Sequence, residues 1–556
     1  MEIFRCISLL WSRGRQTSAR YQKQQPPYNR NICSRPPNSY PSGRISLSQE
    51  GLMAPESFNL LTSTVHDIQQ LFDRSELTAE SLVAQVLDQV EKHNRKGLCL
   101  GALISVAPRQ KLLEQAQLLD QERAAGKARS PLHGIPFIVK DAIATDPELG
   151  MGTTAGSWAL VDSRPHGNAP TVQKLLDAGG ILIGKASLTE FNNFKGEGLV
   201  DGWSPVNGYT RSAYVRGPLK LDEGAMGHSV RSAVGVSAGF GIVSLGVETD
   251  GSIVSPASRA ALYAMKPTIG TVSMDGVVPV SKSLDSVGAM ARSPADLAVV
   301  VEMLQATGPN HDERLSQLMT QKWDGLRIGF VDETIWQLPE SLCTTNDEAL
   351  SQMRKEYHSV MNILADSGAH VEYPVALPLG AKIWPDTGNI MSYEFQPAFN
   401  RYLETLDSSP VRNLKELVDW NRQHADKELP KEHPSQSYLE NALKCNIPAT
   451  ENAKTLASLR KLAGPDGIDK ILKLYQLDAI ASLADSPISS VASAAGYPVA
   501  TMPLGVLDLN GRPFGISMTT GKHQEKKLFQ IMSAWETLGP RQPPPTLEEE
   551  VNQAQV

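Results

Sequence analysis

Residues 246–267 read Gly246-Val-Glu-Thr-Asp-Gly-Ser-Ile-Val-Ser-Pro-Ala-Ser-Arg-Ala-Ala-Leu-Tyr-Ala-Met-Lys-Pro267, and this stretch decides the predicted fold and chemistry. It follows a run of small and aliphatic residues, 232–244, whose short side chains allow two backbones to approach closely. An Asp-Gly-Ser turn can point backbone N–H groups toward a ligand. Ser252 lies at the tip of this turn, which suits a nucleophile beside an oxyanion hole. An ordinary Asx turn between buried segments has the same local sequence.

The residues before this stretch alternate between predicted strands and helices. A strand is predicted over 131–141, a helix over 169–178 and a strand over 180–184, which together indicate β-α-β units. The first strand ends in Lys140, and a lysine at such a place is usually a surface residue whose amine reaches water. If Lys140 is buried instead, its amine is neutral and can serve as a base.

Hydrophobic spacing predicts the other elements. Thr64 and Asp67 form a capping pattern before one helix, and apolar residues recur at helical spacing over 82–90. A charged, helix-rich segment over 322–475 indicates a helical cap or insertion within the domain. Further predicted elements are helices over 106–126, 294–304 and 524–537 and strands over 276–280, 477–483, 494–505 and 514–518.

Composition describes an ordinary globular protein of 556 residues with 41% hydrophobic and 20% charged residues, which can bury a large core. The net charge of −7 gives no general attraction to nucleic acid or to anionic membranes, and no apolar run approaches the ~20 residues of a membrane span. We therefore expect neither partner. Five widely spaced cysteines and no close histidine pair argue against a disulfide framework and a metal site, and we expect no cofactor. The cysteines are Cys6, Cys33, Cys99, Cys343 and Cys445.

Both ends of the chain differ from the middle. Residues 1–52 are basic and rich in proline, which indicates a disordered tail, a presequence, or a true start at Met53 instead of Met1. The cysteine pattern fits a reducing compartment, so we expect a cytoplasmic protein, or a mitochondrial one if residues 1–50 are a presequence. Residues 541–556 are expected to form a disordered C-terminal tail.

A set of spaced motifs extends over residues 57–540. They are Leu132-His-Gly-Ile-Pro-Phe-Ile-Val-Lys-Asp141, Thr153-Thr-Ala-Gly-Ser157, Ala178-Gly-Gly-Ile-Leu-Ile-Gly-Lys-Ala-Ser-Leu-Thr-Glu-Phe191, Gly202-Trp-Ser-Pro205, Glu248-Thr-Asp-Gly-Ser252, Met265-Lys-Pro-Thr268, Ser283-Leu-Asp-Ser-Val-Gly288 and Ala495-Gly-Tyr-Pro498. In this order the motifs resemble the amidase signature family. The resemblance implies one large α/β domain, a twisted mixed sheet with helices on both faces, in place of the three or four domains that length alone suggests. Because of Gly202-Trp-Ser-Pro205 and Glu248-Thr-Asp-Gly-Ser252, it is stronger to stand-alone fungal and peptide-amidase-like enzymes than to aminoacyl-tRNA amidotransferase subunits.

The resemblance also implies roles for residues. The family uses a nucleophilic serine, a bridging serine with a cis peptide bond, and a buried neutral lysine. Ser252 matches the nucleophile that forms the acyl-enzyme, and Lys140 matches the lysine that accepts the proton. Thr249, Asp250 and Gly251 match the oxyanion- and substrate-binding positions, and the resemblance implies that backbone amides around Asp250, Gly251 and Ser252 line the oxyanion hole.

The bridging position departs from the family pattern. The family has Gly-Gly-Ser-Ser-Gly-Gly-Ser where this chain has Met226-Gly-His-Ser-Val-Arg-Ser232. An alignment without a gap places His228 at the bridging serine and Ser229 beside it; otherwise several Gly/Ser residues are missing. Loss of a proton relay costs roughly 10²–10⁴-fold in rate. Either His228 or Ser229 substitutes, or the enzyme is impaired, or the gene model omits part of an exon.

Three functions are compatible with these motifs. The first is an amide hydrolase that acts on a small amide substrate as a monomer or homodimer. The second is a catalytically impaired protein of the same fold that binds a ligand through the former active site. The third is an ammonia-transferring amidotransferase component, which would need a partner chain.

Overall fold

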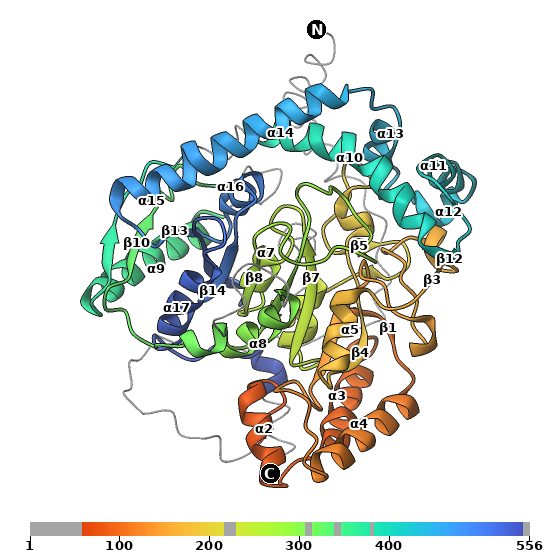
Figure 1. Cartoon of the computed structure of the whole chain (residues 1–556), viewed down its shortest axis with the longest axis horizontal. Helices are drawn as coiled ribbons and strands as arrows, with labels where there is room; N and C mark the ends of the chain where they lie inside the picture. The colour runs from red at the N-terminus through yellow and green to blue at the C-terminus, as the bar shows by residue number, and fades with distance from the viewer. Residues whose placement is uncertain (1–57, 216–229, 306–313, 339–345, 378–382, 549–556) are drawn as a thin grey trace.

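The computed structural model describes residues 58–215, 230–305, 314–338, 346–377 and 383–548 (Figure 1). Its centre is one mixed sheet of eleven strands in the order β1-β4-β2-β7-β9-β8-β14-β15-β13-β10-β11. Strand β2 is parallel to β4 and β7, β10 is parallel to β11 and β13, and the remaining pairs are antiparallel. The strands are β1 Leu103–Val106, β2 Pro136–Lys140, β4 Ile181–Ala186, β7 Val243–Glu248, β8 Tyr263–Lys266, β9 Ser286–Ala291, β10 Arg327–Phe330, β11 His370–Glu372, β13 Ala479–Leu483, β14 Val499–Val506 and β15 Pro513–Thr519.

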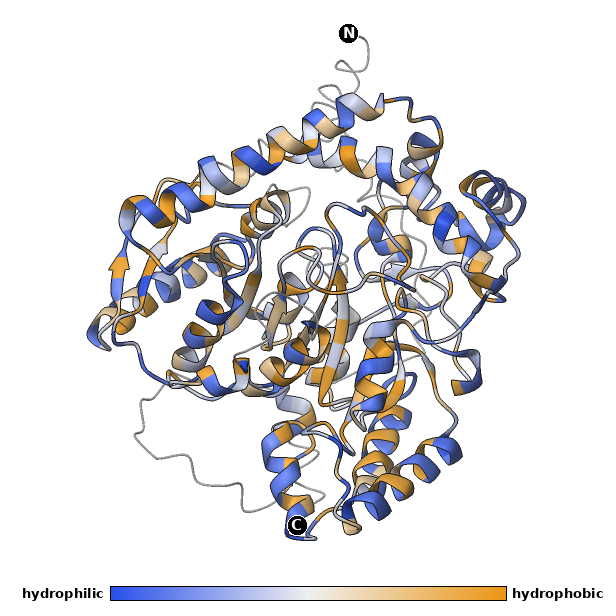
Figure 2. Ribbon diagram, in the orientation of Figure 1, coloured by the Kyte–Doolittle hydropathy of each residue, from blue (hydrophilic) through white to orange (hydrophobic). Residues whose placement is uncertain are grey.

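The middle strands are buried on both faces. Every residue of β2, β4, β7, β8, β9, β13 and β15 is buried, and their sequences are nearly continuous runs of apolar and small residues (Figure 2). Such runs are typical of strands covered by helices on both sides. The predicted α/β class with a single large mixed sheet is confirmed.

Helices before and between the strands follow the predicted hydrophobic spacing. Helix α2 begins with the expected capping box of Thr64 and Asp67, and the apolar residues of α3 are buried. Helices α2, α3 and α4 lie together at one end of the molecule (Figure 1). The helices outside the segment 384–475 are α2 Val65–Asp73, α3 Ala79–His93, α4 Arg109–Ala124, α5 Pro170–Asp177, α6 Val230–Ser237, α7 Val254–Ser258, α8 Pro294–Gln305, α9 Asp347–Asp366, α16 Ile488–Ala495 and α17 Glu525–Glu536.

We call residues 384–475 the helical insertion. Its two long helices, α10 and α14, contact each other and run along one side of the molecule (Figure 1). Helix α14 continues through a short π-helix, Gly464–Ile468, into α15. The insertion comprises α10 Trp384–Glu404, α11 Leu414–Gln423, α12 Ala425–Glu428, α13 Ser437–Leu443, α14 Ala449–Ala463 and α15 Asp469–Tyr475, with β12 Leu406–Ser408 pairing to β3 Arg164–Pro165.

Two predictions of secondary structure are wrong. The helical cap is predicted to begin at residue 322, but β10, α9 and β11 form a parallel β-α-β unit of the main sheet. Charged residues around these short strands conceal the strand pattern. The strand predicted over 276–280 does not form. Among the described residues, only Val277 of this segment pairs with another strand-like residue, in an isolated antiparallel bridge to Ile143.

Part of the predicted C-terminal tail, residues 541–548, is held against the folded domain. Arg541 donates from Nη1 to the carbonyl of Leu61 at 3.0 Å, and Leu547 is fully buried. Residues 1–57, which include the whole predicted N-terminal tail, and residues 549–556, which are half of the predicted C-terminal tail, lie outside the described residues. None of the helices in the described ranges has the length and apolar character that crossing a membrane requires.

Candidate active site

Lys140 is the last residue of β2, which lies between β4 and β7 in the sheet. Its side chain is 0% exposed, and Nζ donates a hydrogen bond to the carbonyl of Val247 at 3.0 Å. The alternative that Lys140 is a surface lysine is therefore wrong. Val247 belongs to the strand that leads into the turn of Ser252, so the lysine amine lies against the backbone of that strand.

Ser252 lies in the turn between β7 and α7 and is 2% exposed. Gly251, just before it, has φ of +75°, a conformation that residues with a side chain rarely adopt. A Cβ at Gly251 would lie 3.0 Å from the hydroxyl oxygens of Ser255 and Ser489. Both the backbone angle and the space therefore require glycine before Ser252.

The backbone of this turn has donors that the described structure leaves unused. In the described residues, no group accepts a hydrogen bond from the backbone N–H of Gly251 or of Ser252. Two adjacent N–H groups on a glycine turn can together stabilise an oxyanion. This geometry fits the predicted oxyanion hole.

Glu248 holds the turn from inside the protein. Its carboxylate is fully buried and accepts hydrogen bonds from the backbone N–H of Ile253 at 2.6 Å and of Val254 at 3.0 Å. Burial raises the pKa of Glu248, although Lys266 and the two backbone donors lower it. The family motif contains Glu248, but no role for it is predicted from the sequence. An acidic residue at the end of an all-apolar strand is the signal that could have revealed it.

Thr249 and Asp250 are fixed by side chains from distant segments. The hydroxyl of Thr249 donates to Asp285 at 2.6 Å, and Asp285 also accepts from the backbone N–H groups of Val280 and Ser281. The carboxylate of Asp250 accepts from the Ser490 hydroxyl at 2.7 Å. Burial raises the pKa of Asp285 to about 6. The turn is thus held on both sides of Gly251.

A second buried lysine supports the strand end that carries Lys140. Lys185 pairs with Val139 in the register of β4 and β2, so its side chain lies on the opposite face of the sheet from Lys140. Its Nζ donates to the carbonyl of Ile143 and the hydroxyl of Thr153, both at 2.6 Å, and lies 3.5 Å from Asp141. Burial lowers the pKa of Lys185 to about 8, although Asp141 raises it.

The two residues predicted at the bridging position, His228 and Ser229, lie outside the described residues. The helix that follows them, α6, packs against β2 and β7. Ser232, at the end of the altered motif, is fully buried, and its hydroxyl has no hydrogen-bond partner among the described residues. The altered sequence therefore leads directly into the helix that covers the strands of Lys140 and Val247.

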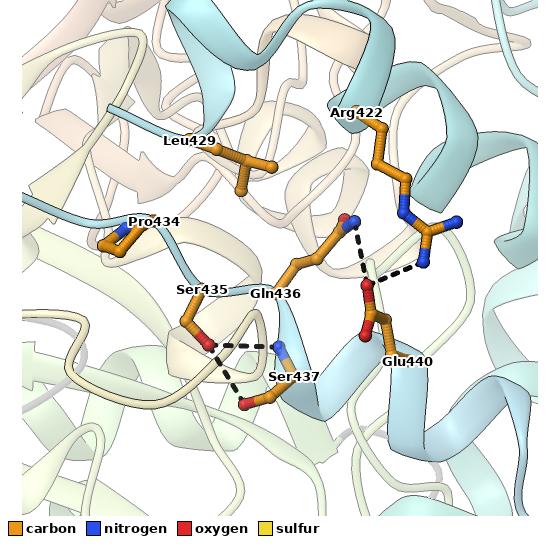
Figure 3. Close-up of a pocket in the computed structure, with 7 residues that line it drawn as sticks. All are labelled: Arg422, Leu429, Pro434, Ser435, Gln436, Ser437 and Glu440. Atoms are coloured by element: carbon orange, nitrogen blue, oxygen red, sulfur yellow. Dashed lines mark hydrogen bonds and ion pairs between the residues drawn. The ribbon is translucent and has the colours of Figure 1, made fainter. Parts of the chain in front are cut away.

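Two observations concern other kinds of site. Within the described ranges, no group of three or more His, Cys, Asp or Glu side chains could hold a metal ion. A pocket of about 360 Å³ lies in the helical insertion, apart from the residues above (Figure 3). Its lining is mostly polar, and Arg422 is paired with Glu440 at 2.8 Å. The lining residues are Arg422, Leu429, Pro434, Ser435, Gln436, Ser437 and Glu440.

Comparison with known proteins gives a consistent result. The family described as Amidase matches residues 81–529. A protein of Arabidopsis thaliana named a probable amidase is 32% identical over 496 residues, covering 86% of this chain and 90% of that protein. A glutamyl-tRNA(Gln) amidotransferase chain from Desulforamulus reducens is 29% identical, covering 65% of this chain and 70% of that protein. The X-ray structure of peptide amidase from Stenotrophomonas maltophilia has a TM-score of 0.78 and 33% identity, covering 87% of this chain and 98% of that chain.

Proposed function

The chain belongs to the amidase family of amide hydrolases, and from this membership we propose that it cleaves a carboxamide C–N bond with Ser252 as nucleophile and Lys140 as base. The observation that carries the proposal is the complete burial of Lys140, with its amine against the strand that leads to Ser252. Burial disfavours the charged form of an amine, and the neutral amine is the form that accepts a proton.

The proposed reaction has two halves. The Ser252 hydroxyl oxygen attacks the carbonyl carbon of the amide while its proton passes through a bridging group to Lys140. The backbone N–H groups of Gly251 and Ser252 hold the resulting oxyanion. Collapse breaks the C–N bond, the proton returns to the leaving nitrogen, and ammonia or an amine departs. Water then attacks the acyl-enzyme by the same proton route, which releases the carboxylic acid and restores Ser252.

The bridging group is proposed from the sequence alone. His228 holds the position of the bridging serine when the motifs are aligned without a gap, and Ser229 is its neighbour. Either side chain has a group that can accept and donate a proton. The same departure from the family motif supports the second candidate, a catalytically impaired protein that keeps the binding site.

A fluorophosphonate probe separates the two candidates, because it labels only an activated hydroxyl. We expect labelling of the wild-type chain at Ser252, identified by mass spectrometry of the modified peptide, and none in Ser252→Ala or Lys140→Met. A folded wild-type chain that resists the probe, and that also fails to hydrolyse a panel of carboxamides including peptide amides, would support the impaired candidate. The transcript across codons 224–236 tests whether the altered motif is genuine.

We also propose that the enzyme acts without a partner chain, as a monomer or homodimer. Its identity to the peptide amidase is 33% over 87% of the chain, whereas two glutamyl-tRNA(Gln) amidotransferase subunits that match 86% of the chain are 26% identical to it. Full hydrolytic activity in the monomer or homodimer fraction of a sizing column would support this. A co-purifying second protein that is needed for activity would favour the amidotransferase role. We propose a cytoplasmic location, or a mitochondrial one if residues 1–50 are removed on import.

A further inference from the structure

Three charged side chains that have no role in the proposed reaction meet in the interior of the protein. Lys195 donates from Nζ to Glu190 at 2.6 Å and to Glu428 at 2.8 Å, and all three side chains are 0% exposed. Glu190 and Lys195 follow β4, whereas Glu428 ends α12 of the helical insertion. The three charges are therefore contributed by two parts of the molecule that are far apart in sequence.

The cluster connects the insertion to the loop after β2. The second oxygen of Glu428 accepts from the hydroxyl of Ser157 at 3.0 Å and from the backbone N–H of Trp158 at 2.5 Å. Lys195 also donates from Nζ to the backbone carbonyl of Glu428 at 2.5 Å. Ser157 belongs to the loop whose residue Thr154 is bonded to Asp141, the neighbour of Lys140.

The chain between Glu190 and Lys195 has an unusual backbone. Phe191, Asn192 and Asn193 have φ of +49°, +55° and +69° in succession. Left-handed conformations are costly for residues other than glycine, and they persist where the surroundings enforce them. This tight path brings the side chains of Glu190 and Lys195 together within five residues of sequence.

The hydrogen bonds of the two carboxyl groups differ. Both oxygens of Glu428 act as acceptors, Oε2 from Lys195 and Oε1 from Ser157 and Trp158. Glu190 accepts from Lys195, and its Oε1 faces no donor in the described part of the chain. Two carboxylates and one ammonium would leave a net negative charge in the interior, which is far more costly than binding one proton.

We propose that Glu190, Lys195 and Glu428 form a latch that fastens the helical insertion to the core, with a proton held on Glu190 while Lys195 and Glu428 stay charged. The latch closes when the cluster is neutral and loosens when Glu190 ionises. This inference does not depend on the catalytic roles proposed for Ser252 and Lys140.

The charged and titratable groups around Glu190 agree with a proton being held on its carboxyl group. Burial raises the pKa of Glu190 well above its ordinary value, and Glu428 adds to the rise although Lys195 opposes it. A further titratable group of the insertion is His433, whose pKa is lowered by burial and also by Lys195, so that it adds no positive charge at neutral pH. Because the folded protein binds the Glu190 proton more tightly than the unfolded chain, where the pKa is near 4.5, the stabilisation is greatest at low pH and falls as pH rises.

Paired glutamine substitutions test the latch. Glutamine resembles a protonated glutamic acid in shape and has no charge, so Glu190→Gln should preserve the cluster, whereas Glu428→Gln should move the negative charge to Glu190 and leave the insertion without an ion pair to Lys195. We would measure hydrogen exchange by mass spectrometry at pH 7 in peptides covering 424–439 and 153–158. We expect Glu190→Gln to match the wild type and Glu428→Gln to exchange at least tenfold faster in both peptides. Equal acceleration in both variants, acceleration in Glu190→Gln alone, or none in either would overturn the proposal.

A second measurement does not need the Glu428 variant to fold. The thermal midpoint of the wild type between pH 6 and pH 9.5 is compared with that of Glu190→Gln, and Glu404→Gln, at an exposed position in α10, serves as the matched charge control. The latch predicts that the difference between Glu190→Gln and wild type moves by several degrees in favour of the variant as pH rises, while the control shows no such trend. A constant difference, or one that moves in favour of the wild type, would show that Glu190 is already ionised in the folded protein.

Discussion

Lys140 donates from its Nζ to the carbonyl of Val247 at 3.0 Å, which connects the end of β2 to the strand that enters the Ser252 turn. The bond orients a fully buried amine along the backbone of that strand. A buried lysine is rarely tolerated unless it is bonded or functional, because burial of its charge is costly. The contact therefore supports Lys140 as the base that serves Ser252.

Replacement of Ser252 by alanine should abolish activity while leaving the fold intact. Removal of the nucleophile in serine hydrolases of other folds lowers kcat by about 10⁶-fold. No described residue bonds the Ser252 hydroxyl, and removal of one oxygen leaves almost no cavity, so we expect the thermal midpoint to change by less than about 2 °C. Activity on a carboxamide and a thermal melt are measured on the same sample. Wild-type turnover by the alanine variant would disprove the role of Ser252.

Substitution at Gly251 should disable the turn. Alanine there meets the hydroxyls of Ser255 and Ser489 at 3.0 Å and must adopt φ of +75°. Gly126 is the matched control, because its φ is +72° and nothing lies within 4 Å of an added Cβ. We expect Gly126→Ala to cost about 1 kcal/mol of stability with normal activity. Gly251→Ala should lose at least about 10²-fold in kcat, as expected when one oxyanion donor is displaced. Equal activity of the two variants would contradict the oxyanion-hole assignment.

Glu248 should be needed for its acceptor oxygen more than for its charge. Both backbone donors, Ile253 and Val254, bond the same carboxylate oxygen, so a glutamine carbonyl can accept from both. Glu248→Ala leaves two buried N–H groups unpaired, at about 1–3 kcal/mol each, and releases the turn next to Ser252. We expect the alanine variant to lose both stability and kcat, and the glutamine variant to keep most of both. Urea denaturation and steady-state kinetics measure the two effects, and similar losses in both variants would mean that the charge itself matters.

Asp285 should make the protein less stable as pH rises through 6. Its folded-state pKa of about 6 lies above the ordinary 3.8, so the folded protein binds this proton more tightly and loses that stabilisation between pH 3.8 and pH 6. The shift corresponds to about 3 kcal/mol at ~1.36 kcal/mol per pH unit. Asp285→Asn removes this dependence. We therefore expect the stability of Asp285→Asn relative to wild type to increase by up to that amount between pH 4 and pH 7, which urea titrations at both pH values would measure. A difference that is constant with pH would mean an ordinary pKa.

The parts of the fold that local patterns encode could be predicted from the sequence. The capping box at Thr64 and the apolar strand ending in Lys140 are both visible over a few residues. The burial of Lys140 could not be settled in this way, since it depends on the strands at both sides. The role of Glu428 was also missed, because Ser157 and its carboxylate are 271 residues apart and no local pattern specifies such a contact. The four-residue strand β10 was missed because it is too short to show a period.

Restoring the family sequence at residues 226–231 would test the proton route. The change Met226-Gly-His-Ser-Val-Arg231 to Gly-Gly-Ser-Ser-Gly-Gly supplies a serine at the position of His228 and the glycines that a tight loop requires. If the natural sequence impairs the relay, the restored enzyme should gain roughly 10²–10⁴-fold in kcat with little change in KM, since proton transfer acts on the chemical step. If His228 or Ser229 already carries the proton, restoration should change kcat by less than tenfold, and His228→Ala or Ser229→Ala alone should reduce it.

The Ser252→Ala change in the restored background is the control for this experiment, because any activity that survives it does not come from this site. Two results together would show that the natural sequence at His228 breaks the proton relay. The gain in kcat on restoration would require Ser252, and His228→Ala and Ser229→Ala would each leave the activity of the natural enzyme unchanged. A loss of activity in either alanine variant of the natural enzyme would instead identify that side chain as the bridge. Alanine has no group that can accept and donate a proton, so its introduction interrupts the transfer from Ser252 to Lys140.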